Sequence, residues 1–289
     1  MSKRILLTGA SGGLGSALYQ AWQQKYTLLG LAHQNAHQDL QAIDLVQPEP
    51  IAELVKSWQP DLIVHTVGLT DVDRCDREPA AAMDINVNTT LNIRLAAEAI
   101  GCKVIHISTN DVFGGQSGMY LETDLPEPIN FYSHTKLMAE KMFYGYENSL
   151  ILRFTILSWY ASGKTAFARW LVESLRAGQS VRLFQNQFNA PLYVSTLAKW
   201  IEVLFEATGT YHLGSERHSR YEAGYALAEA MGLDTSLIIP GRVEDVAFDA
   251  PRPLDVSLNC QKVAKDWGLQ TRLEDEIAQM LKTCPEDLK

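Results

Sequence analysis

The chain has 289 residues, of which 46% are hydrophobic and 20% charged, and it carries a formal net charge of −9 at pH 7. This length allows a self-sufficient core, either in one large α/β domain or in a nucleotide-binding domain with a smaller second lobe. The acidic balance argues against nucleic acid as a partner, and no apolar run approaches the roughly 18 residues of a membrane span, so a cytoplasmic protein is expected.

Neither the cysteines nor the histidines predict a metal site. His33 and His37 have a metal-like spacing, but the residues around them are typical of a polar loop after a strand. The cysteines form no Cys-x-x-Cys pair, so we interpret them as structural thiols in a reducing compartment. They are Cys75, Cys102, Cys260 and Cys284.

Short apolar runs alternate with segments of helical periodicity in the first half of the chain, which predicts a parallel sheet with crossover helices. Leu14, Leu18 and Trp22 recur on one face of a first helix. A long helix is predicted from about Ala80 to Ala99, and another from Tyr132 to Tyr146. The predicted strands are Arg4 to Thr8, Tyr26 to Ala32, Leu40 to Asp44, Asp61 to Val67, Lys103 to Ser108 and Leu150 to Phe154.

This series of strands and helices predicts an α/β fold, a Rossmann-type doubly wound parallel sheet with a smaller C-terminal substrate-binding lobe. Beyond about Thr155 the pattern loosens and prolines punctuate shorter elements. We therefore predict an NAD(P)-binding Rossmann domain over residues 1–155 and a substrate-binding lobe over residues 156–289. Segments near residues 190–205 are expected to return to the first domain.

A glycine-rich turn joins the first predicted strand to the first helix, with the spacing G-x-x-G-x-x-G. Such a turn directs a helix N-terminus and free backbone N–H groups at a pyrophosphate, and glycine lets the phosphate approach closely. The turn therefore predicts a nicotinamide dinucleotide site. Its cofactor-binding residues are Gly9, Ser11, Gly12, Gly13, Leu14 and Gly15.

Two other interpretations compete with this one. Gly9 to Gly13 also spells G-x-S-x-G, the nucleophile elbow of α/β-hydrolases, but too few residues precede it to supply the upstream oxyanion loop. Ser158 to Thr165 ends like the phosphate-binding loop of an ATPase, but serine stands where the first glycine belongs. We interpret the second segment as a connecting loop.

Ketone reduction needs an acid aimed at the developing alkoxide, in addition to a hydride from the nicotinamide. Tyr132 and Lys136 are four residues apart, hence on one helix face, where an ammonium lowers the pKa of a tyrosine from about 10. Tyr160 and Lys164 repeat the spacing, but in a glycine-containing loop. Thr109 follows a predicted strand at the carboxyl edge of the sheet, where its hydroxyl is placed to hold a substrate carbonyl.

With these motifs the chain resembles the extended short-chain dehydrogenase/reductase superfamily, and within it the dTDP-4-dehydrorhamnose reductase group, over nearly its whole length. The resemblance implies an NAD(P)H-dependent reductase of a keto sugar nucleotide. Besides the glycine turn it is carried by His106-Ile-Ser-Thr109, Phe131-Tyr-Ser-His-Thr-Lys136, Ala139-Glu140, Leu152-Arg153, Asn186 to Pro191, Gly209 to Leu213 and Arg252-Pro253.

The resemblance also implies roles for single residues. Thr109, Tyr132 and Lys136 would form a catalytic triad, in which the tyrosine donates the proton, the lysine holds the cofactor ribose and tunes the tyrosine, and the threonine contacts the substrate oxygen. Further cofactor contacts are implied for Asp44, Leu45, Thr66, Val67, Gly68 and Asn86. Substrate specificity is expected from the second lobe, at Trp159, Asn189 and Arg252.

The choice between NADP and NAD depends on the end of the second predicted strand, Ala32-His33-Gln34. An NAD site usually carries an acidic residue there, which binds the ribose 2′-hydroxyl. His33 is expected to contact the cofactor instead, and the missing carboxylate favours NADP because it would not repel a 2′-phosphate. No arginine is present there to clamp that phosphate.

Two other functions stay open. The beta subunit of methionine adenosyltransferase is similar to the same group and binds NADP, which makes a non-catalytic regulatory subunit one alternative. Sugar-nucleotide epimerases and dehydratases share the scaffold, and Asn110-Asp111 resembles the acidic residues that dehydratases add after the threonine. Members of the group commonly pair through the two helices at about Ala80 to Ala99 and Tyr132 to Tyr146, so the resemblance also admits a homodimer.

Overall fold

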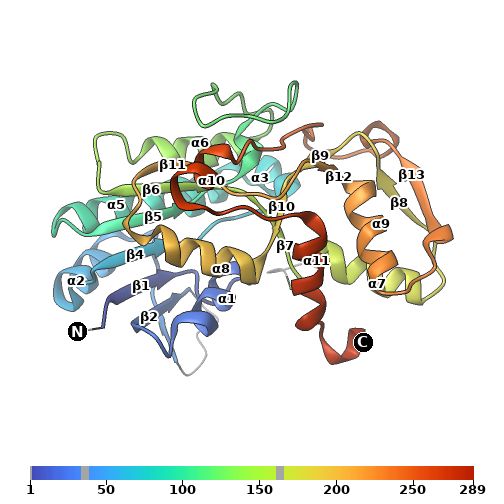
Figure 1. The fold of residues 1–289 in the computed structure, drawn as a ribbon. Coiled ribbons are helices and arrows are strands. Elements are labelled where there is room, and N and C mark those ends of the chain that lie inside the picture. The colour runs from blue at the N-terminus through green and yellow to red at the C-terminus, as the bar shows by residue number, and fades with distance from the viewer. Residues whose placement is uncertain (1, 34–38, 161–165) are drawn as a thin grey trace. The chain divides into compact units, whose positions relative to one another are not determined.

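The computed structural model describes residues 2–33, 39–160 and 166–289 (Figure 1). These residues form two compact units, each assembled from segments that are distant in the sequence. The first unit comprises Met1–Val112, Pro128–Arg153 and Leu204–Tyr211. The second unit comprises Phe113–Glu127, Phe154–Val203 and His212–Lys289.

The first unit is organised around a seven-stranded sheet with the order β11-β6-β5-β4-β1-β2-β3 (Figure 1). Strand β1 pairs in parallel with both β2 and β4, and the pairs β2/β3, β4/β5 and β5/β6 are also parallel. From β1 the chain adds β2 and β3 towards one edge of the sheet and then adds β4, β5 and β6 on the other side of β1. This reversal of the strand order between β1 and β4 is that of the Rossmann fold, so the predicted fold class is confirmed. The strands are β1 (Arg4–Thr8), β2 (Thr27–Ala32), β3 (Leu40–Ala42), β4 (Leu62–His65), β5 (Lys103–Ile107), β6 (Ser149–Arg153) and β11 (Gly209–His212).

The central strands read as continuous apolar runs because helices cover both faces of a parallel sheet. Ile5, Leu6 and Leu7 of β1 are all 0% exposed, and every residue of β4 and β5 is buried. The edge strand β3 has no fully buried residue. The burial pattern therefore places the core of this unit on the two faces of the central strands.

The helices of the first unit are α1 (Gly13–Trp22), α2 (Pro48–Trp58), α3 (Val72–Arg77), α4 (Pro79–Met83), α5 (Thr89–Glu98) and α6 (Phe131–Lys141). The long helix predicted near residues 80–99 is present as one continuous helical stretch, in which the π-helical segment η1 (Asp84–Asn88) joins α4 to α5. Helix α6 begins where the Asn130 side chain accepts a hydrogen bond from Ser133 N. The prediction that it reaches Tyr146 is wrong, because Gly145 has a φ of 78° and cannot continue a helix.

The second unit contains three two-stranded ladders: β7/β10, β9/β12 and β8/β13. Helices α7 and α9 pack against β8, and Figure 1 shows them beside β8 and β13. Its strands are β7 (Thr155–Leu157), β8 (Val181–Phe184), β9 (Phe188–Asn189), β10 (Pro191–Tyr193), β12 (His218–Ser219) and β13 (Ile238–Gly241). Its helices are α7 (Phe167–Arg176), α8 (Val194–Val203), α9 (Arg220–Ala230), α10 (Gln261–Trp267) and α11 (Leu273–Lys282).

The compact units are not separated by a single cut in the chain. Residues 113–127 belong to the second unit, and the segment that returns to the first is residues 204–211, which contribute the edge strand β11. Residues 191–203 stay in the second unit, where β10 pairs with β7. The assignment of substrate binding to residues 156–289 stays a prediction. Among the described residues, no helix is both long enough and apolar enough to cross a membrane.

Candidate active site

The glycine turn between β1 and α1 requires glycine at two of its positions. Gly9 has a φ of 66°, and a Cβ there would lie 2.7 Å from Thr66 Oγ1. A Cβ on Gly15 would lie 2.1 Å from the backbone oxygen of Gly9. Gly12 N closes the turn with a 2.9 Å hydrogen bond to that same oxygen. The tight shape therefore depends on the missing side chains and not only on the sequence pattern.

The first turn of α1 can accept an anion. Its N-cap residue, Gly12, supplies no side-chain hydrogen bond, and the first turn carries no acidic residue. The N–H groups that begin a helix have no acceptor within the helix, and here they belong to Gly13, Leu14 and Gly15. The helix dipole adds partial positive charge at this end. The turn thus fits the pyrophosphate of a dinucleotide, as its sequence predicts.

Thr66, Val67 and Gly68 directly follow β4, which lies beside β1 at the point where the strand order reverses. Ligands of doubly wound sheets bind at this point. Thr66 Oγ1 donates a 2.7 Å hydrogen bond to the oxygen of Thr8 and so ties the two strand ends together. All three residues are partly exposed, so they are available to line a bound cofactor.

Asn86 lies on the helical segment η1, next to Gly68 of the loop after β4. Its side chain is 0% exposed, and its amide oxygen accepts from Leu69 N at 2.7 Å. Its amide nitrogen donates to Leu69 O at 3.2 Å and to Thr135 Oγ1 at 2.8 Å. Asn86 thus braces the loop after β4 against α6, and its contact with the cofactor stays a prediction.

A carboxylate from after β3 lies beside the end of β2. Asp44 Oδ1 lies 3.8 Å from His33 Nδ1 and also accepts a 3.0 Å hydrogen bond from Val46 N. Leu45 is 6% exposed and belongs to the hydrophobic core. The absence of an acid from β2 itself therefore does not leave this end of the sheet without one. Because Asp44 supplies a carboxylate there, the structure favours NADP over NAD less than the sequence does.

The residues considered for metal binding and for the rival phosphate and tyrosine motifs fall partly outside the described chain. His37 lies outside the described residues, as does Lys164 of the second Y-x-x-x-K match and the end of the segment from Ser158 to Thr165. Within the described part of the chain, no group of three or more His, Cys, Asp or Glu side chains is arranged to hold a metal ion. All four cysteines are free thiols.

The structure brings Thr109, Tyr132 and Lys136 together at the carboxyl end of β5. The side chains of Thr109 and Tyr132 are hydrogen-bonded to each other, and each residue is 7% exposed. Lys136 is 4% exposed, and its Nζ donates a 2.7 Å hydrogen bond to the oxygen of Ile107. Tyr132 also packs with Cys75 in a small hydrophobic cluster, which shields the phenol from water.

The electrostatics of the site differ from the sequence-based expectation that Lys136 lowers the pKa of Tyr132. Burial raises the pKa of Tyr132 well above its ordinary value, Asp111 and Cys75 raise it further, and the hydrogen bond from Thr109 lowers it only in part. Burial lowers the pKa of Lys136 to about 8, against the opposing effect of Glu140. The phenol is therefore held in its neutral, proton-donating form.

Two buried histidines lie on the strands next to the site and were not predicted as functional. Burial, with a smaller contribution from Lys136, lowers the pKa of His65 to about 3. Thr90 donates its hydroxyl proton to Asn86 O, so His65 Nε2 must be the donor in its 3.1 Å contact with Thr90 Oγ1. Thr8 Oγ1 contacts the other ring nitrogen at 2.8 Å. His65 is thus a neutral imidazole in a defined tautomer.

Of the three residues of the second unit that were predicted to bind substrate, Trp159 is a core residue. It is 1% exposed, and its indole N–H donates a 3.0 Å hydrogen bond to Met280 O. Asn189 on β9 is half-buried and accepts from Thr155 Oγ1 at 3.2 Å. The guanidinium of Arg252 lies 4.6 Å from the ring centre of Phe248. Asn189 and Arg252 stay candidates, whereas the packing of Trp159 leaves it no surface for a ligand.

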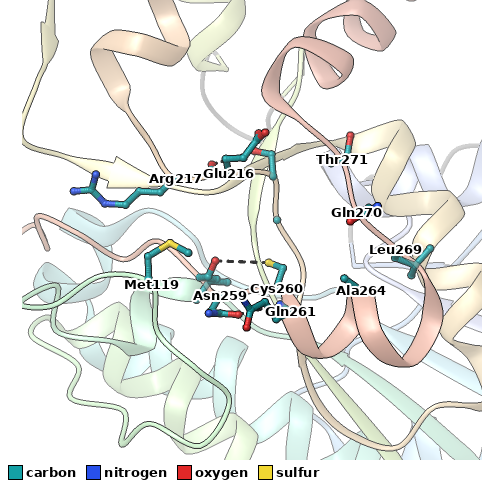
Figure 2. A pocket seen from close by; sticks show the side chains of 13 residues that line it. Met119, Glu216, Arg217, Asn259, Cys260, Gln261, Ala264, Leu269, Gln270 and Thr271 are labelled. Carbon is teal, nitrogen blue, oxygen red and sulfur yellow. Dashed lines mark hydrogen bonds between the residues drawn. The ribbon is translucent and has the colours of Figure 1, made fainter.

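A pocket of about 240 Å³ lies within the second unit (Figure 2). None of the three predicted substrate residues lines it. Its charged side chains have protein partners, since Glu216 accepts from Leu273 N at 2.9 Å and Arg217 pairs with Asp255 at 2.7 Å. The lining residues are Met119, Gly214, Ser215, Glu216, Arg217, Leu258, Asn259, Cys260, Gln261, Ala264, Leu269, Gln270 and Thr271.

Comparison with known proteins gives a consistent family. The model of the RmlD substrate binding domain matches residues 3–285. The dTDP-4-dehydrorhamnose reductase of Escherichia coli K12 is 32% identical over 281 residues, which cover 92% of this chain and 92% of that protein. Methionine adenosyltransferase 2 subunit beta of Rattus norvegicus is 31% identical over 276 residues, covering 91% of this chain and 82% of that protein.

A solved structure shares the fold along both chains. The dTDP-4-dehydrorhamnose reductase of Bacillus anthracis, in complex with NADP, superposes with a TM-score of 0.90 at 23% identity and covers 98% of this chain and 100% of its own. The predicted enzyme class, an NAD(P)-dependent oxidoreductase of the short-chain type, is that of the family matched here. The chain therefore belongs to the RmlD substrate binding domain family of extended short-chain dehydrogenases/reductases.

Proposed function

We propose that the protein is a reductase that transfers a hydride from NADPH or NADH to the keto group of a sugar nucleotide. The observation that carries the proposal is the convergence of Thr109, Tyr132 and Lys136 at the carboxyl end of β5. This end of a parallel sheet is where α/β enzymes bind their ligands, and the glycine turn opens onto the same end. The family relationship supports the same reaction class.

The residues divide the work of cofactor binding in this proposal. The backbone of the glycine turn holds the pyrophosphate at the N-terminus of α1, and Thr66 to Gly68 line the cofactor beside β4. A reduced nicotinamide, when bound, supplies the hydride. Lys136 reaches the end of β5, where its ammonium is placed to hold a ribose hydroxyl.

Tyr132 supplies the proton in this proposal. A proton donor for an alkoxide must be protonated at working pH, and burial raises the pKa of Tyr132 and keeps it so. Thr109, which hydrogen-bonds Tyr132, positions the substrate oxygen next to the phenol. Once the phenol has given up its proton, the nearby ammonium of Lys136 stabilises the phenolate.

The substrate is the least constrained part of the proposal. A keto sugar nucleotide, with 4-keto-rhamnose linked to dTDP as one candidate, follows from the name of the relative that is 32% identical. Asn189 and Arg252 of the second unit offer an amide and a guanidinium for its polar groups. A guanidinium is the side chain best suited to a diphosphate.

The test follows NADPH and NADH absorbance with a panel of 4-keto sugar nucleotides. Tyr132→Phe is expected to lower kcat by about 10² to 10⁴-fold, the usual contribution of a general acid, and to leave cofactor affinity unchanged. Tyr144→Phe is the matched control, because Tyr144 follows α6 and is 74% exposed. Unchanged turnover in Tyr132→Phe would overturn the assignment.

A regulatory subunit is the second candidate, favoured by the 31% identity to methionine adenosyltransferase 2 subunit beta. In that case cofactor binds but no keto sugar is turned over, and the protein co-purifies with a catalytic partner. An epimerase or dehydratase is a third outcome of the same assay. It is favoured by Asp111, an acidic residue after Thr109 whose charge raises the pKa of Tyr132. It would convert substrate without net consumption of reduced cofactor.

Pairing of two copies through α5 and α6 is also a proposal. Leu95 on α5 is 47% exposed and Met138 on α6 is 39% exposed, so both helices present apolar side chains on the surface of this chain. Light scattering of the purified protein distinguishes a dimer from a monomer. Leu95→Glu is expected to dissociate a dimer of this kind.

A further inference from the structure

Three ionisable side chains of α6 lie one helical turn apart on a single face: Tyr132, Lys136 and Glu140. Each is bonded to a different residue of one short segment at the end of β5. In the order of the helix, these partners are Thr109, the backbone oxygen of Ile107 and the hydroxyl of Ser108. One face of the helix thus fixes three consecutive residues of the strand end.

Glu140 is the most extensively bonded of the three. It is 4% exposed, and Arg153 approaches it with two donors, Nε at 2.9 Å from Oε1 and Nη2 at 2.6 Å from Oε2. Ser108 Oγ donates a third hydrogen bond, at 2.5 Å, to Oε1. Two-pronged charged hydrogen bonds of this kind define both the position and the orientation of a carboxylate.

The charges around this face leave Lys136 dependent on Glu140. Lys136 and Arg153 are two buried cations. Glu140 forms its ion pair with Arg153, and its negative charge, one helical turn from Lys136 on α6, also favours the charged form of that lysine. Removing that carboxylate charge would leave two cations in a dry environment, which is strongly unfavourable. Because an arginine keeps its proton, the lysine would be the group to lose one.

We propose that Glu140 is a positioning residue of the active site, which keeps Lys136 in its ammonium form and, through Ser108, fixes the strand end that carries Thr109. The proposal rests on the proposed function, since it matters for catalysis only if Lys136 and Thr109 act there. The charge on Lys136 is nevertheless measurable in the protein without cofactor or substrate.

Lys136 is surrounded by other ionisable groups on the strands and helices around it. The two histidines on β4 and β5 are buried, and their pKa values are lowered by burial and by Lys136 itself, so they add no charge near neutral pH. The remaining ionisable groups on α6 are Tyr132, His134 and Lys141. The helical segments packed against it carry Asp73, Arg74, Cys75, Asp76 and Arg77 on α3, Asp84 on η1 and Asp111 after β5, and β6 carries Arg153, the partner of Glu140.

The direct test is an NMR titration of the full-length protein labelled at lysine Cε, with the Lys136 signal assigned from a Lys136→Met spectrum. We expect Lys136 to titrate near pH 8 in the unaltered chain. In Glu140→Gln the midpoint should fall by at least one pH unit, a tenfold loss of proton affinity. Glu147→Gln, which removes an exposed carboxylate shortly after α6, should leave it unchanged. An unmoved midpoint in Glu140→Gln overturns the proposal.

Two further variants separate charge from position and remain informative if Glu140→Gln does not fold. Arg153→Gln leaves the carboxylate of Glu140 in place with Lys136 as the buried cation beside it, so the midpoint of Lys136 should not fall, and a fall overturns the proposal. Ser108→Ala removes one hydroxyl and no charge, so the midpoint should stay while kcat falls at least tenfold. Glu140→Asp keeps the charge and should restore most of the midpoint that Glu140→Gln loses.

The same variants distinguish this inference from the proposed function. A shifted Lys136 midpoint with no turnover on any keto sugar would leave the role of Glu140 intact and remove the reductase assignment. Turnover of a keto sugar with an unshifted Lys136 midpoint would support the reductase assignment and overturn the role of Glu140. In an active enzyme, the alkaline limb of the kcat profile should move to lower pH in Glu140→Gln, which lost packing alone would not produce.

Discussion

The imidazole rings of His65 and His106 are stacked with their centres 5.6 Å apart, on the neighbouring strands β4 and β5. Both side chains are 0% exposed. Their hydrogen bonding differs completely. Within the described part of the chain, His65 contacts Thr8 and Thr90 through its two ring nitrogens, whereas neither ring nitrogen of His106 has a hydrogen-bond partner. Two adjacent and equally buried histidines therefore contribute to stability with opposite sign.

Replacing each histidine by leucine should reveal this difference. His106→Leu removes two unsatisfied polar atoms and should leave the free energy of unfolding unchanged or raise it by about 1 kcal/mol. His65→Leu leaves the hydroxyls of Thr8 and Thr90 without their ring partners and should lower it by about 1–3 kcal/mol. Urea denaturation of both variants at pH 7.5 measures the two changes. An equal loss of unfolding free energy in His65→Leu and His106→Leu would contradict the difference in hydrogen bonding between the two rings.

The pH dependence of stability should also report these rings. Burial lowers the pKa of His65 to about 3 and that of His106 well below its ordinary value. The unfolded chain therefore binds more protons than the folded one below pH 6.5, so stability is complete above that pH and falls as the pH falls. At pH 5 the expected loss is about 2 kcal/mol for each ring.

Urea midpoints between pH 8 and pH 5 test this expectation, with His106→Leu as the matched variant. That variant should lose about half of the acid dependence of the unaltered chain, because one of the two buried rings no longer titrates on unfolding. A flat profile from pH 8 to pH 5 would show that both rings are protonated in the folded state as readily as in the unfolded chain.

The strands and the catalytic helix were predictable because their signals are local. Central parallel strands are continuous apolar runs, and the four-residue spacing of Tyr132 and Lys136 is a property of any helix. The pairing of Glu140 with Arg153 is not local, since it depends on β6 packing beside β5. Similarly, an isolated tryptophan in a loop gave no sign that Trp159 is buried and bonded to Met280.

The sign of the shift at Tyr132 was also out of reach of the sequence. The four-residue spacing predicts that Lys136 and Tyr132 lie on one helix, and both lie on α6. Whether its ammonium or the burial of the phenol dominates depends on how much water reaches the ring, which the packing of α3, α4 and α6 decides. Burial dominates in the structure, so the phenol pKa rises.

Replacing Gly15 and Gly68 by alanine should distinguish a glycine that the fold of the turn requires from one that only lines the predicted cofactor site. A Cβ on Gly15 would lie 2.1 Å from Gly9 O, so Gly15→Ala must displace the turn and should cost about 1–3 kcal/mol of stability. A Cβ on Gly68 would meet its nearest atom, Asn86 Oδ1, at an ordinary 3.5 Å. Gly68→Ala should therefore keep its stability to within about 0.5 kcal/mol.

Cofactor affinity should fall in both glycine variants, for different reasons. Gly15→Ala distorts the turn proposed to hold the pyrophosphate, while Gly68→Ala adds a methyl group to the loop proposed to line the cofactor. Thermal denaturation and quenching of NADPH fluorescence measure stability and affinity separately. Wild-type affinity in Gly68→Ala would remove that residue from the predicted cofactor contacts, and wild-type affinity in Gly15→Ala would remove the turn itself.

The cofactor preference should depend on Asp44. Its carboxylate lies 3.8 Å from His33 at the end of β2, where the adenosine ribose of a dinucleotide is expected. If the carboxylate faces the 2′ position, it repels the phosphate of NADP, and Asp44→Asn should shift the ratio of the two Kd values towards NADP by about tenfold, equivalent to 1.4 kcal/mol. If instead it flanks the adenine, as the family resemblance implies, both affinities should fall together. We expect the first result, since the His33 contact places the charge at the strand end, and parallel titrations with NADPH and NADH decide between the two.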